Sequence, residues 1–162
     1  MSDLSDLYDT DYGEWARRNA RLLSAGDFGG LDVAHLLEEL DDRAKSERRE
    51  LENRLTILLA HLLKRQSQLP QLSERRREFD GRSWPSTIIE QRDRLAKRLR
   101  ETPSLKPVLS QMLPKAYADA VAAKERGLPA ATFPPSCPYG EAELLDESFY
   151  PRATSAAVHE RA

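Results

Sequence analysis

Two charged residues interrupt helical patterns that are otherwise apolar. Glu47 occupies a position where the near-heptad spacing of a leucine-rich segment calls for an apolar side chain. Arg92 does the same in a later segment, where Ile88 and Leu95 mark the apolar face. A charged group that is buried without a partner is strongly destabilising. We therefore predict that Glu47 and Arg92 form an ion pair between two neighbouring helices.

The same charges could instead belong to a ligand-binding or catalytic site between those two helices. Glu39, Arg54 and His61 share the leucine-rich segment with Glu47 and could complete such a site with Arg92. A catalytic histidine needs an orienting carboxylate and a nucleophile, and the sequence places no obvious nucleophile near His61. Structural ion pairs also perturb ionisable groups, so we prefer the structural interpretation and keep the polar site as the alternative.

An acidic cluster early in the leucine-rich segment raises the question of metal binding. Its members are Glu38, Glu39, Asp41 and Asp42. Dinuclear metal sites in helical bundles use a Glu-x-x-His spacing on two helices, whereas here His35 precedes the acidic residues, in the reverse order. The chain also lacks the glycine-rich phosphate loops of nucleotide-binding enzymes. We therefore expect a solvated acidic helix face, no metal and no cofactor.

Charge is distributed unevenly along a chain whose net charge is −2. Residues 1–60 contain 8 Lys/Arg against 14 Asp/Glu, whereas residues 61–100 contain 11 against 5. The basic segment could contact the phosphates of a nucleic acid, and the candidate contacts are Arg75, Arg76, Arg77 and Arg82. Interleaved acidic residues and a sequence pI of about 6.0 argue against nucleic-acid binding. We expect instead that the basic segment faces the acidic first third of the chain.

These residues must be positioned by helices, and the strongest helical signal begins at Val33. No Gly or Pro interrupts residues 31–69, and apolar side chains recur there at the spacing of a helix that packs along one side. The apolar stripe consists of Val33, Leu37, Leu40, Ala44, Leu51, Leu55, Leu58 and Leu62. We predict one helix of roughly 33 residues, about 50 Å long.

Capping and breaking residues delimit the other predicted elements. A first helix is expected over about residues 11–25, with Gly26 at its end, and Phe28 is expected to anchor the following turn to the core. A basic loop over residues 69–81 then leads to a helix that begins near residue 83 or 86 and ends near residue 101. The remaining elements are a helix over residues 104–125, a proline-rich arm over residues 128–138 and a short helix around residues 141–146.

The predicted fold class is all-α, a bundle of four main helices with one long central helix and a proline-rich C-terminal arm. A length of 162 residues favours a single domain, which we place at residues 1–151, with a flexible tail at residues 152–162. The single cysteine, Cys137, excludes an internal disulfide and indicates a reducing compartment. No segment approaches the ~20 apolar residues that span a membrane, and no signal peptide is apparent. We therefore expect a cytoplasmic protein.

Several short motifs occur in the order found in a known family. They include Tyr8-Asp9-Thr10-Asp11-Tyr12 followed by Trp15, Leu37-Glu38-Glu39-Leu40, Leu58-Leu59-Ala60-His61-Leu62-Leu63-Lys64 and Cys137-Pro138-Tyr139. From about Leu7 to Pro151, the chain resembles the domain-of-unknown-function family number 29. The resemblance implies a bacterial, all-helical and cytoplasmic protein with no assigned activity, so it supplies no catalytic residues.

The function that we expect is a non-enzymatic protein-interaction module, whose partner is an unidentified protein or a second copy of the chain. This hypothesis predicts an exposed apolar patch on the long helix. The alternative is an enzyme or small-ligand binder that uses the polar site between the long helix and the helix that contains Arg92. Nucleic-acid binding through the basic segment, residues 64–100, is the third and least favoured hypothesis.

Overall fold

The computed structural model describes residues 3–67, 74–124 and 132–152, and all their side chains except those of residues 74–84 and 124. The regular elements in these residues are helices, without a strand, which confirms the predicted all-α class. Within the described part, no helix is both long and apolar enough to span a bilayer. The chain divides into two compact units, Met1–Glu47 (unit 1) and Arg48–Ala162 (unit 2). That residues 1–151 form a single domain stays a prediction.

Unit 1 consists of three short helical elements and the beginning of a long helix. They are α1 (Leu4–Thr10), α2 (Tyr12–Ala25), the 3-10 helix η1 (Phe28–Gly30) and the start of α3 (Val33–Ser67). The Asp11 carboxylate caps α2 by accepting a hydrogen bond from the Glu14 backbone N–H at 3.1 Å. Gly26 ends α2 with a φ of 72°, which glycine adopts without strain. The predicted helix over residues 11–25 is thereby confirmed, whereas the sequence pattern does not predict α1.

The turn after α2 differs from the prediction. Phe28 is 66% exposed, so the expectation that it anchors this turn to the core is wrong. The turn is held instead by backbone hydrogen bonds from Gly26 and Asp27 to the last carbonyls of α2. Because these bonds satisfy the helix end, the turn does not depend on an apolar anchor.

The helix α3 spans 35 residues and confirms the predicted long helix. Its second half supplies the core of unit 2, where its fully buried leucines include Leu51, Leu55, Leu58 and Leu62. Its first half differs, because Val33, Leu37 and Leu40 are 52%, 61% and 69% exposed. The predicted stripe is therefore a core face only in unit 2, and its first part is an apolar surface.

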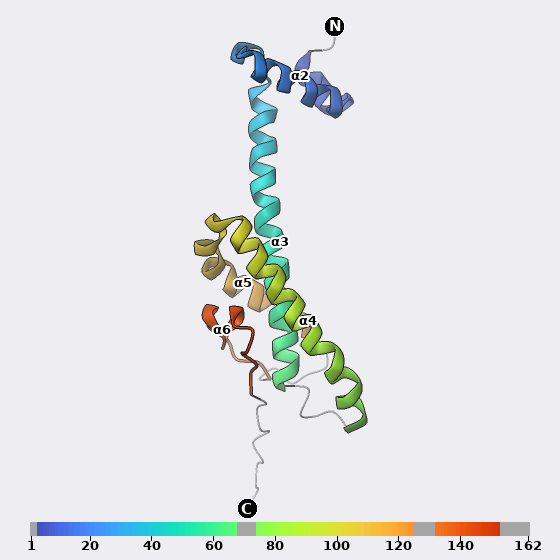
Figure 1. Cartoon of the computed structure of the whole chain (residues 1–162), viewed down its shortest axis with the longest axis vertical. Helices are drawn as coiled ribbons and strands as arrows, with labels where there is room; N and C mark the ends of the chain where they lie inside the picture. The colour runs from blue at the N-terminus through green and yellow to red at the C-terminus, as the bar shows by residue number, and fades with distance from the viewer. Residues whose placement is uncertain (1–2, 68–73, 125–131, 153–162) are drawn as a thin grey trace, which may run out of the picture. The chain divides into compact units, whose positions relative to one another are not determined.

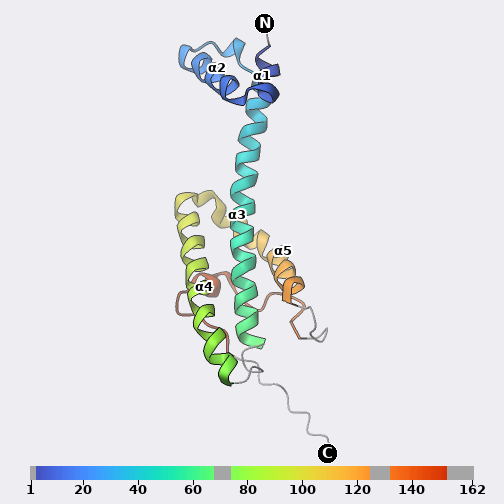
Figure 2. The same cartoon turned by 90° about the vertical axis from the view of Figure 1, so that its right-hand side faces the viewer.

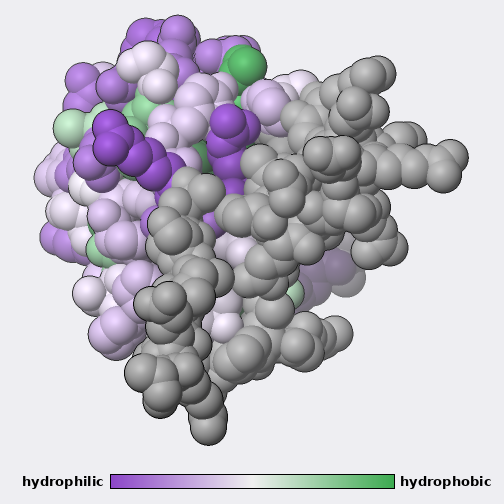
Figure 3. Space-filling model, turned by 90° about the horizontal axis from the view of Figure 1, so that it is seen from below, coloured by the Kyte–Doolittle hydropathy of each residue, from purple (hydrophilic) through white to green (hydrophobic). Residues whose placement is uncertain are grey.

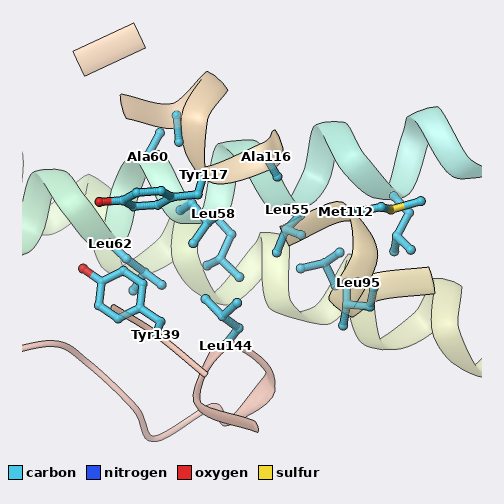
Figure 4. Packing of buried hydrophobic residues seen from close by; sticks show 14 of the residues in the cluster. Leu55, Leu58, Ala60, Leu62, Leu95, Met112, Ala116, Tyr117, Tyr139 and Leu144 are labelled. Carbon is cyan, nitrogen blue, oxygen red and sulfur yellow. The ribbon is translucent and has the colours of Figure 1, made fainter. Parts of the chain in front are cut away.

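Unit 2 surrounds the second half of α3 with the remaining helices. They are α4 (Glu74–Glu101), the short η3 (Pro103–Leu105), α5 (Lys106–Lys124) and α6 (Glu141–Leu145). The helices α4 and α5 lie on opposite sides of α3, and α4 runs antiparallel to it (Figure 1, Figure 2). Buried side chains from all of these helices form one cluster, which includes Leu58, Leu95, Tyr117 and Leu144 (Figure 4). Seen from below, the described surface is mostly hydrophilic (Figure 3).

The predicted basic loop over residues 69–81 is wrong in its second part, because α4 begins at Glu74. Gly81 and Pro85 favour a loop and a late helix start in the sequence, yet α4 contains both residues. Proline removes one backbone hydrogen bond, whereas the Glu and Arg residues at positions 74–78 have high helix propensity. Residues 69–73 of the predicted loop lie outside the described residues.

A proline-rich arm follows α5, as predicted for residues 128–138. In its described part, the Tyr117 hydroxyl donates to the Pro134 carbonyl at 2.7 Å, and Phe133 packs against the core. The helix α6 confirms the predicted short helix around residues 141–146. Residues 128–131 of the arm, and the predicted tail from residue 153 onward, lie outside the described residues.

Candidate functional site

Aromatic and polar side chains of unit 1 gather around the start of α3. Asp32, His35 and Glu39 are spaced by three and four residues, which places them on one face of the helix. The Asp32 carboxylate accepts a hydrogen bond from the Trp15 indole N–H at 2.9 Å, and its Oδ2 lies 2.7 Å from His35 Nδ1. The Tyr8 ring stacks on the His35 ring, with centroids 4.1 Å apart. The unit 1 cluster consists of Tyr8, Tyr12, Trp15, Asn19, Asp32, His35 and Glu39.

Glu39, a predicted site residue, accepts hydrogen bonds from two tyrosines in this cluster. The Tyr8 hydroxyl donates to Glu39 Oε1 at 2.8 Å, and the Tyr12 hydroxyl donates to Oε2 at 3.1 Å. The hydrogen bond to Glu39, together with burial, raises the pKa of Tyr8 to about 12. The hydrogen bond from the Tyr12 hydroxyl to Glu39 is likewise the main cause of the raised pKa of Tyr12. Both phenols therefore stay protonated at neutral pH and hold α1 and α2 against α3.

A buried amide connects α2 to the beginning of α3. Asn19 Nδ2 donates to the Trp15 carbonyl at 2.9 Å, and Asn19 Oδ1 accepts from the Asp32 backbone N–H at 3.1 Å. Both ends of the amide are thus paired, as a buried polar side chain requires. The Asp32 side chain in turn faces the His35 backbone N–H at 3.5 Å, in the position of a helix N-cap.

Ser5, His35 and Asp32 do not form a serine-type catalytic relay. In such a relay, the nucleophile and the orienting carboxylate contact opposite nitrogens of the histidine ring. Here Ser5 Oγ lies 3.4 Å from Nδ1, the same atom that lies 2.7 Å from Asp32. The arrangement fits a structural role instead, in which Asp32 accepts hydrogen bonds from Trp15 of α2 and from the first turn of α3.

The Asp32→Ala variant is expected to destabilise unit 1 by about 1–2 kcal/mol, because Trp15 and the start of α3 lose their acceptor. Burial raises the pKa of Asp32, but hydrogen bonds from His35 and Trp15 outweigh burial and hold the pKa below its ordinary value of 3.8. The charge therefore stabilises the fold above that value, and this stabilisation is lost as the pH falls through the lower folded pKa. Trp15 fluorescence during urea unfolding, in a Trp84→Phe background, measures the effect.

Asp27→Ala is the control for this variant, because the Asp27 side chain makes no cap hydrogen bond. Its urea midpoint should equal that of the parent chain. The difference between the parent chain and Asp32→Ala should shrink as the pH is lowered from about 5 to about 2. Equal losses in the two variants, or a difference that grows at low pH, would contradict the role assigned to Asp32.

The sequence contains a signal for part of this cluster. The spacing of Asp32, His35 and Glu39 is visible in the sequence, but it also suits a solvated helix face. Tyr8 is missed as a partner of Glu39, because the helical spacing of Leu4, Leu7 and Tyr8 covers too short a segment to predict a helix. Tyr12 lies in a predicted helix, but its sequence position does not indicate that it contacts Glu39. The sequence features that point to these hydrogen bonds are the Glu39 carboxylate, for which the sequence offers no evident cationic partner, and the Tyr-x-x-x-Tyr spacing of residues 8–12.

The predicted partners Glu47 and Arg92 contact other groups. Glu47 Oε1 lies 2.9 Å from Arg43 Nη2, one turn earlier on α3. Arg92 Nε donates to the Leu144 carbonyl at 2.9 Å, and Arg92 Nη2 donates to the Glu143 carbonyl at 3.4 Å. Glu47 belongs to unit 1 and Arg92 to unit 2, so the ion pair between them stays a prediction.

The direction of α4 explains the different partner of Arg92. Arg98, nearly two turns after Arg92, lies 2.5 Å from Glu50 of α3. Because α4 runs antiparallel to α3 (Figure 2), the contact between Arg98 and Glu50 implies that Arg92, which precedes Arg98, lies alongside residues of α3 that follow Glu50. Sequence periodicity identifies the face of a helix but not the alignment between two helices.

Arg92 carries a buried charge, with 2% of the residue exposed. Its guanidinium lies 5.4 Å from the centre of the Tyr150 ring and 6.0 Å from that of Phe149. Burial lowers the pKa of Arg92, and its Nη1 has no hydrogen-bond partner in the described part of the chain. The carbonyls that Arg92 binds belong to the last turn of α6, where a helix leaves them without backbone donors. Arg92 therefore anchors α6 to α4.

Arg54, another predicted site residue, lines a polar pocket between α3 and α4 in unit 2. The pocket has a volume of about 240 Å³ and is lined by Glu50, Leu51, Arg54, Arg94, Lys97, Arg98 and Glu101. Arg54 is the one residue that this pocket shares with the polar site suggested by the sequence, whereas Glu39, Glu47, His61 and Arg92 do not line it. The suggested site, which combines all five residues, stays a prediction.

A larger and mostly apolar cavity lies between α5 and the arm, with a volume of about 950 Å³. Its walls include Pro114, Tyr117, Phe133 and Cys137. Burial raises the pKa of the Cys137 thiol, so the group is protonated at neutral pH and unsuited to nucleophilic attack. His61, half-buried on α3, lines neither this cavity nor the polar pocket.

The remaining sequence candidates concern phosphate and metal binding. Arg75, Arg76, Arg77 and Arg82 belong to α4, but their side chains lie outside the described ones. Among residues 3–67, 74–124 and 132–152, no three His, Cys, Asp or Glu side chains gather as metal ligands would. Of the acidic residues near the start of α3, Glu39 accepts hydrogen bonds from Tyr8 and Tyr12 in the unit 1 cluster.

Comparison with known proteins identifies the family. Neither curated proteins nor solved structures include a match to this sequence. A family model, described as domain of unknown function DUF29, matches residues 7–150. The match begins within α1, extends past α6, and includes both the unit 1 cluster and the pocket between α3 and α4. The chain therefore belongs to the DUF29 family.

Proposed function

We propose that the chain is a non-enzymatic protein-interaction module that self-associates through the first half of α3. The exposed residues Val33, Leu37 and Leu40, named the α3 stripe from here on, carry this proposal. Their spacing of four and three residues places them on one side of the helix. An apolar helix face with this spacing is typical of a surface that packs against another helix.

The small core of unit 1 supports this proposal. Its buried residues, among those described, are Leu7, Trp15 and Asn19. Several large apolar residues outside the α3 stripe are exposed as well, namely Tyr12, Leu23 and Phe28. A unit that buries so little apolar surface gains little stability from its own core. A partner that covers the exposed residues would supply the missing burial.

The distribution of charge along α3 favours a second copy of the chain as the partner. Residues 38–42 contain four acidic residues and no basic one, whereas residues 43–49 contain four basic residues and one acidic residue. In an antiparallel pair that brings the two α3 stripes together, Leu37 lies near the two-fold axis, and the acidic residues 38–42 of the two copies extend to opposite sides of it. A parallel pair would place like charges together. We therefore propose an antiparallel, two-fold symmetric dimer.

A bacterial, cytoplasmic location belongs to the same proposal. The single cysteine suits a reducing compartment, where structural disulfides are rare. The family resemblance implies a bacterial source. Fractionation of cells that produce the protein at native level, with the full chain recovered outside the cytoplasm, would overturn this part.

Leu37→Lys is expected to weaken the dimer by at least about 100-fold, because two-fold symmetry brings two lysines into one apolar interface. Sedimentation equilibrium of the full chain over a range of concentrations measures the dissociation constant. The parent chain should change from monomer to dimer within this range, and Leu37→Lys should remain monomeric throughout.

Ile89→Lys is the matched control, since Ile89 is also an exposed apolar residue but lies on α4 in unit 2. It should dimerise as the parent chain does. A parent chain that is monomeric at every concentration overturns the self-association. So does an Ile89→Lys variant that loses the dimer as completely as Leu37→Lys.

A small-ligand binder is the second candidate function, and the polar pocket around Arg54 favours it. Ligand sites are concave and contain a few convergent polar groups. The pocket combines four cationic side chains with two carboxylates, so its chemistry suits an anion. This candidate and the interaction module use different units of the chain and are compatible with each other.

A further inference from the structure

We infer that the pocket between α3 and α4 binds a dianionic oxyanion, in the form of the phosphate group of a small phosphomonoester. The pocket, named the basic pocket from here on, consists of Glu50, Leu51, Arg54, Arg94, Lys97, Arg98 and Glu101. This inference rests on the second candidate function and is independent of self-association.

Two helices direct cations into the basic pocket. Arg94, Lys97 and Arg98 are three and four residues apart along α4, which places them on one face. Arg54 comes from α3, and its side chain and that of Arg98 are 28% and 25% exposed. These two guanidiniums are therefore held by surrounding protein, while Lys97 remains more mobile, with 68% of its side chain exposed. Charges that are partly fixed lose less freedom when an anion binds.

Glu50 shows that the two arginines are positioned for an oxyanion. One of its carboxylate oxygens lies 2.5 Å from Arg98 Nη2, and the other lies 3.9 Å from Arg54 Nη2. Planar guanidinium groups bind carboxylate and phosphate oxygens with the same fork geometry. A phosphate that enters beside Glu50 can therefore be bound by the same two guanidinium groups.

The charge of the basic pocket matches a dianion. Its lining contains four cationic side chains and two carboxylates, which leaves a net charge of +2. Two of the cations also have acidic partners on α4 itself, since Arg94 lies 2.5 Å from Glu90 and Lys97 lies 3.8 Å from Glu101. Solvent-exposed ion pairs of this kind are weak, so they exchange readily for contacts with a bound phosphate.

The volume of the basic pocket limits the size of the ligand. Its volume of about 240 Å³ is about eight times the volume that one molecule occupies in liquid water. A phosphate group with a short substituent fits this space, whereas a nucleotide would extend far beyond it. A nucleic-acid backbone offers monoanionic phosphodiesters, which match the net charge of +2 less well.

The test is a titration of the full chain, at constant ionic strength, followed by backbone amide shifts in NMR spectra. Glycerol 3-phosphate serves as the phosphomonoester, and inorganic phosphate as the smallest dianion. Dimethyl phosphate represents the phosphodiester of a nucleic-acid backbone. We expect saturable shifts at residues 50–54 and 94–101, with the monoester binding at least about tenfold more tightly than the diester.

The protonation state of the ligand provides a second measurement. The second pKa of a phosphomonoester is about 6, so at about pH 5 roughly a tenth of it is dianionic. Its apparent affinity should therefore fall about tenfold between about pH 7.5 and about pH 5. Sulfate is dianionic at both values and should bind about equally well at the two, which separates titration of the ligand from titration of the pocket.

Variants of single cations locate the site. Lys97→Gln and Arg54→Gln should each weaken phosphomonoester binding about two- to fivefold. Arg100→Gln is the matched control, because Arg100 is an exposed cation on the same helix that does not line the pocket. It should bind as the parent chain does.

Three results would overturn the inference. They are the absence of saturable shifts in the pocket, equal affinity for monoester and diester, and an equal loss in Arg100→Gln and Lys97→Gln. Saturable pocket shifts with acetate but not with phosphate would retain a ligand site there and reject the phosphate. None of these outcomes affects the sedimentation of Leu37→Lys, so failure of the phosphate site is distinguishable from failure of the dimer.

Discussion

Replacing Arg92 with methionine is expected to lower the free energy of unfolding of unit 2 by about 1–2 kcal/mol and to release α6 from α4. Methionine keeps an unbranched apolar stem at this position. It leaves the carbonyls of Leu144 and Glu143 without the donors that Arg92 supplies. The helix α6 then loses the polar contact that holds it in place.

The expected loss of stability in Arg92→Met is the balance of opposing contributions to the free energy of unfolding. A hydrogen bond to a charged group is worth about 1.5–3 kcal/mol after desolvation is included, and the contacts of Arg92 with Phe149 and Tyr150 add about 0.5–1 kcal/mol. The second hydrogen bond, to Glu143, is long at 3.4 Å and counts for less. The buried Nη1 of Arg92 has no hydrogen-bond partner in the described part of the chain and opposes these contributions. Its removal in Arg92→Met is expected to regain about 1–3 kcal/mol of stability. The balance remains destabilising.

Two measurements on Arg92→Met test this expectation. Urea unfolding gives the loss of stability, and hydrogen exchange of the amides in Glu141–Leu145 reports the release of α6. Arg94→Met is the control, because Arg94 is an exposed neighbour on the same helix that pairs with Glu90. It should change stability by less than about 0.5 kcal/mol. Unchanged exchange in α6 of Arg92→Met would show that Arg92 is not its anchor.

The burial of Arg92 could be predicted from the sequence, but its partner could not. The apolar residues Ile88 and Leu95 on either side place Arg92 on the buried face of α4, and the residue is indeed buried. For a buried arginine, the partner expected from the sequence is an acidic side chain. The acceptors of Arg92 are backbone carbonyls at the end of α6, and no residue type marks such carbonyls in a sequence.

The two candidate sites show the same limit. The spacing of Asp32, His35 and Glu39 can be read from the sequence, because all three belong to one helical face. The basic pocket joins Arg54 of α3 to Arg98 of α4, and this combination depends on the alignment of two antiparallel helices. Short-range periodicity describes a helix face, whereas a site shared by two helices depends on contacts distant in sequence.

The length of α3 could be predicted because every local signal agrees. Residues 31–69 contain neither Gly nor Pro, and their leucines keep a helical spacing throughout. The sequence does not predict which groups cover each part of the apolar face of α3. The pattern of apolar residues is the same whether that face packs against its own chain, packs against a partner or is exposed to solvent. Leu40 and Leu55 are equivalent in this pattern but differ in burial.

Leu55→Ala is expected to lower the free energy of unfolding by about 2–5 kcal/mol, whereas Leu40→Ala should change it by less than about 0.5 kcal/mol. Leu55 is fully buried in the core of unit 2, where its truncation removes apolar contacts and leaves a cavity (Figure 4). Leu40 is 69% exposed, so its truncation removes little burial from the monomer.

The comparison is well controlled, because both variants replace leucine by alanine within α3 and so change helix propensity equally. Urea unfolding at a protein concentration far below the dissociation constant of the dimer keeps self-association out of both measurements. At higher concentration, a dimer held by the α3 stripe would make Leu40→Ala destabilising too, because the side chain is then buried. A large loss in Leu40→Ala at low concentration would mean that the first half of α3 is covered within the monomer, and the α3 stripe would then not be a free interface.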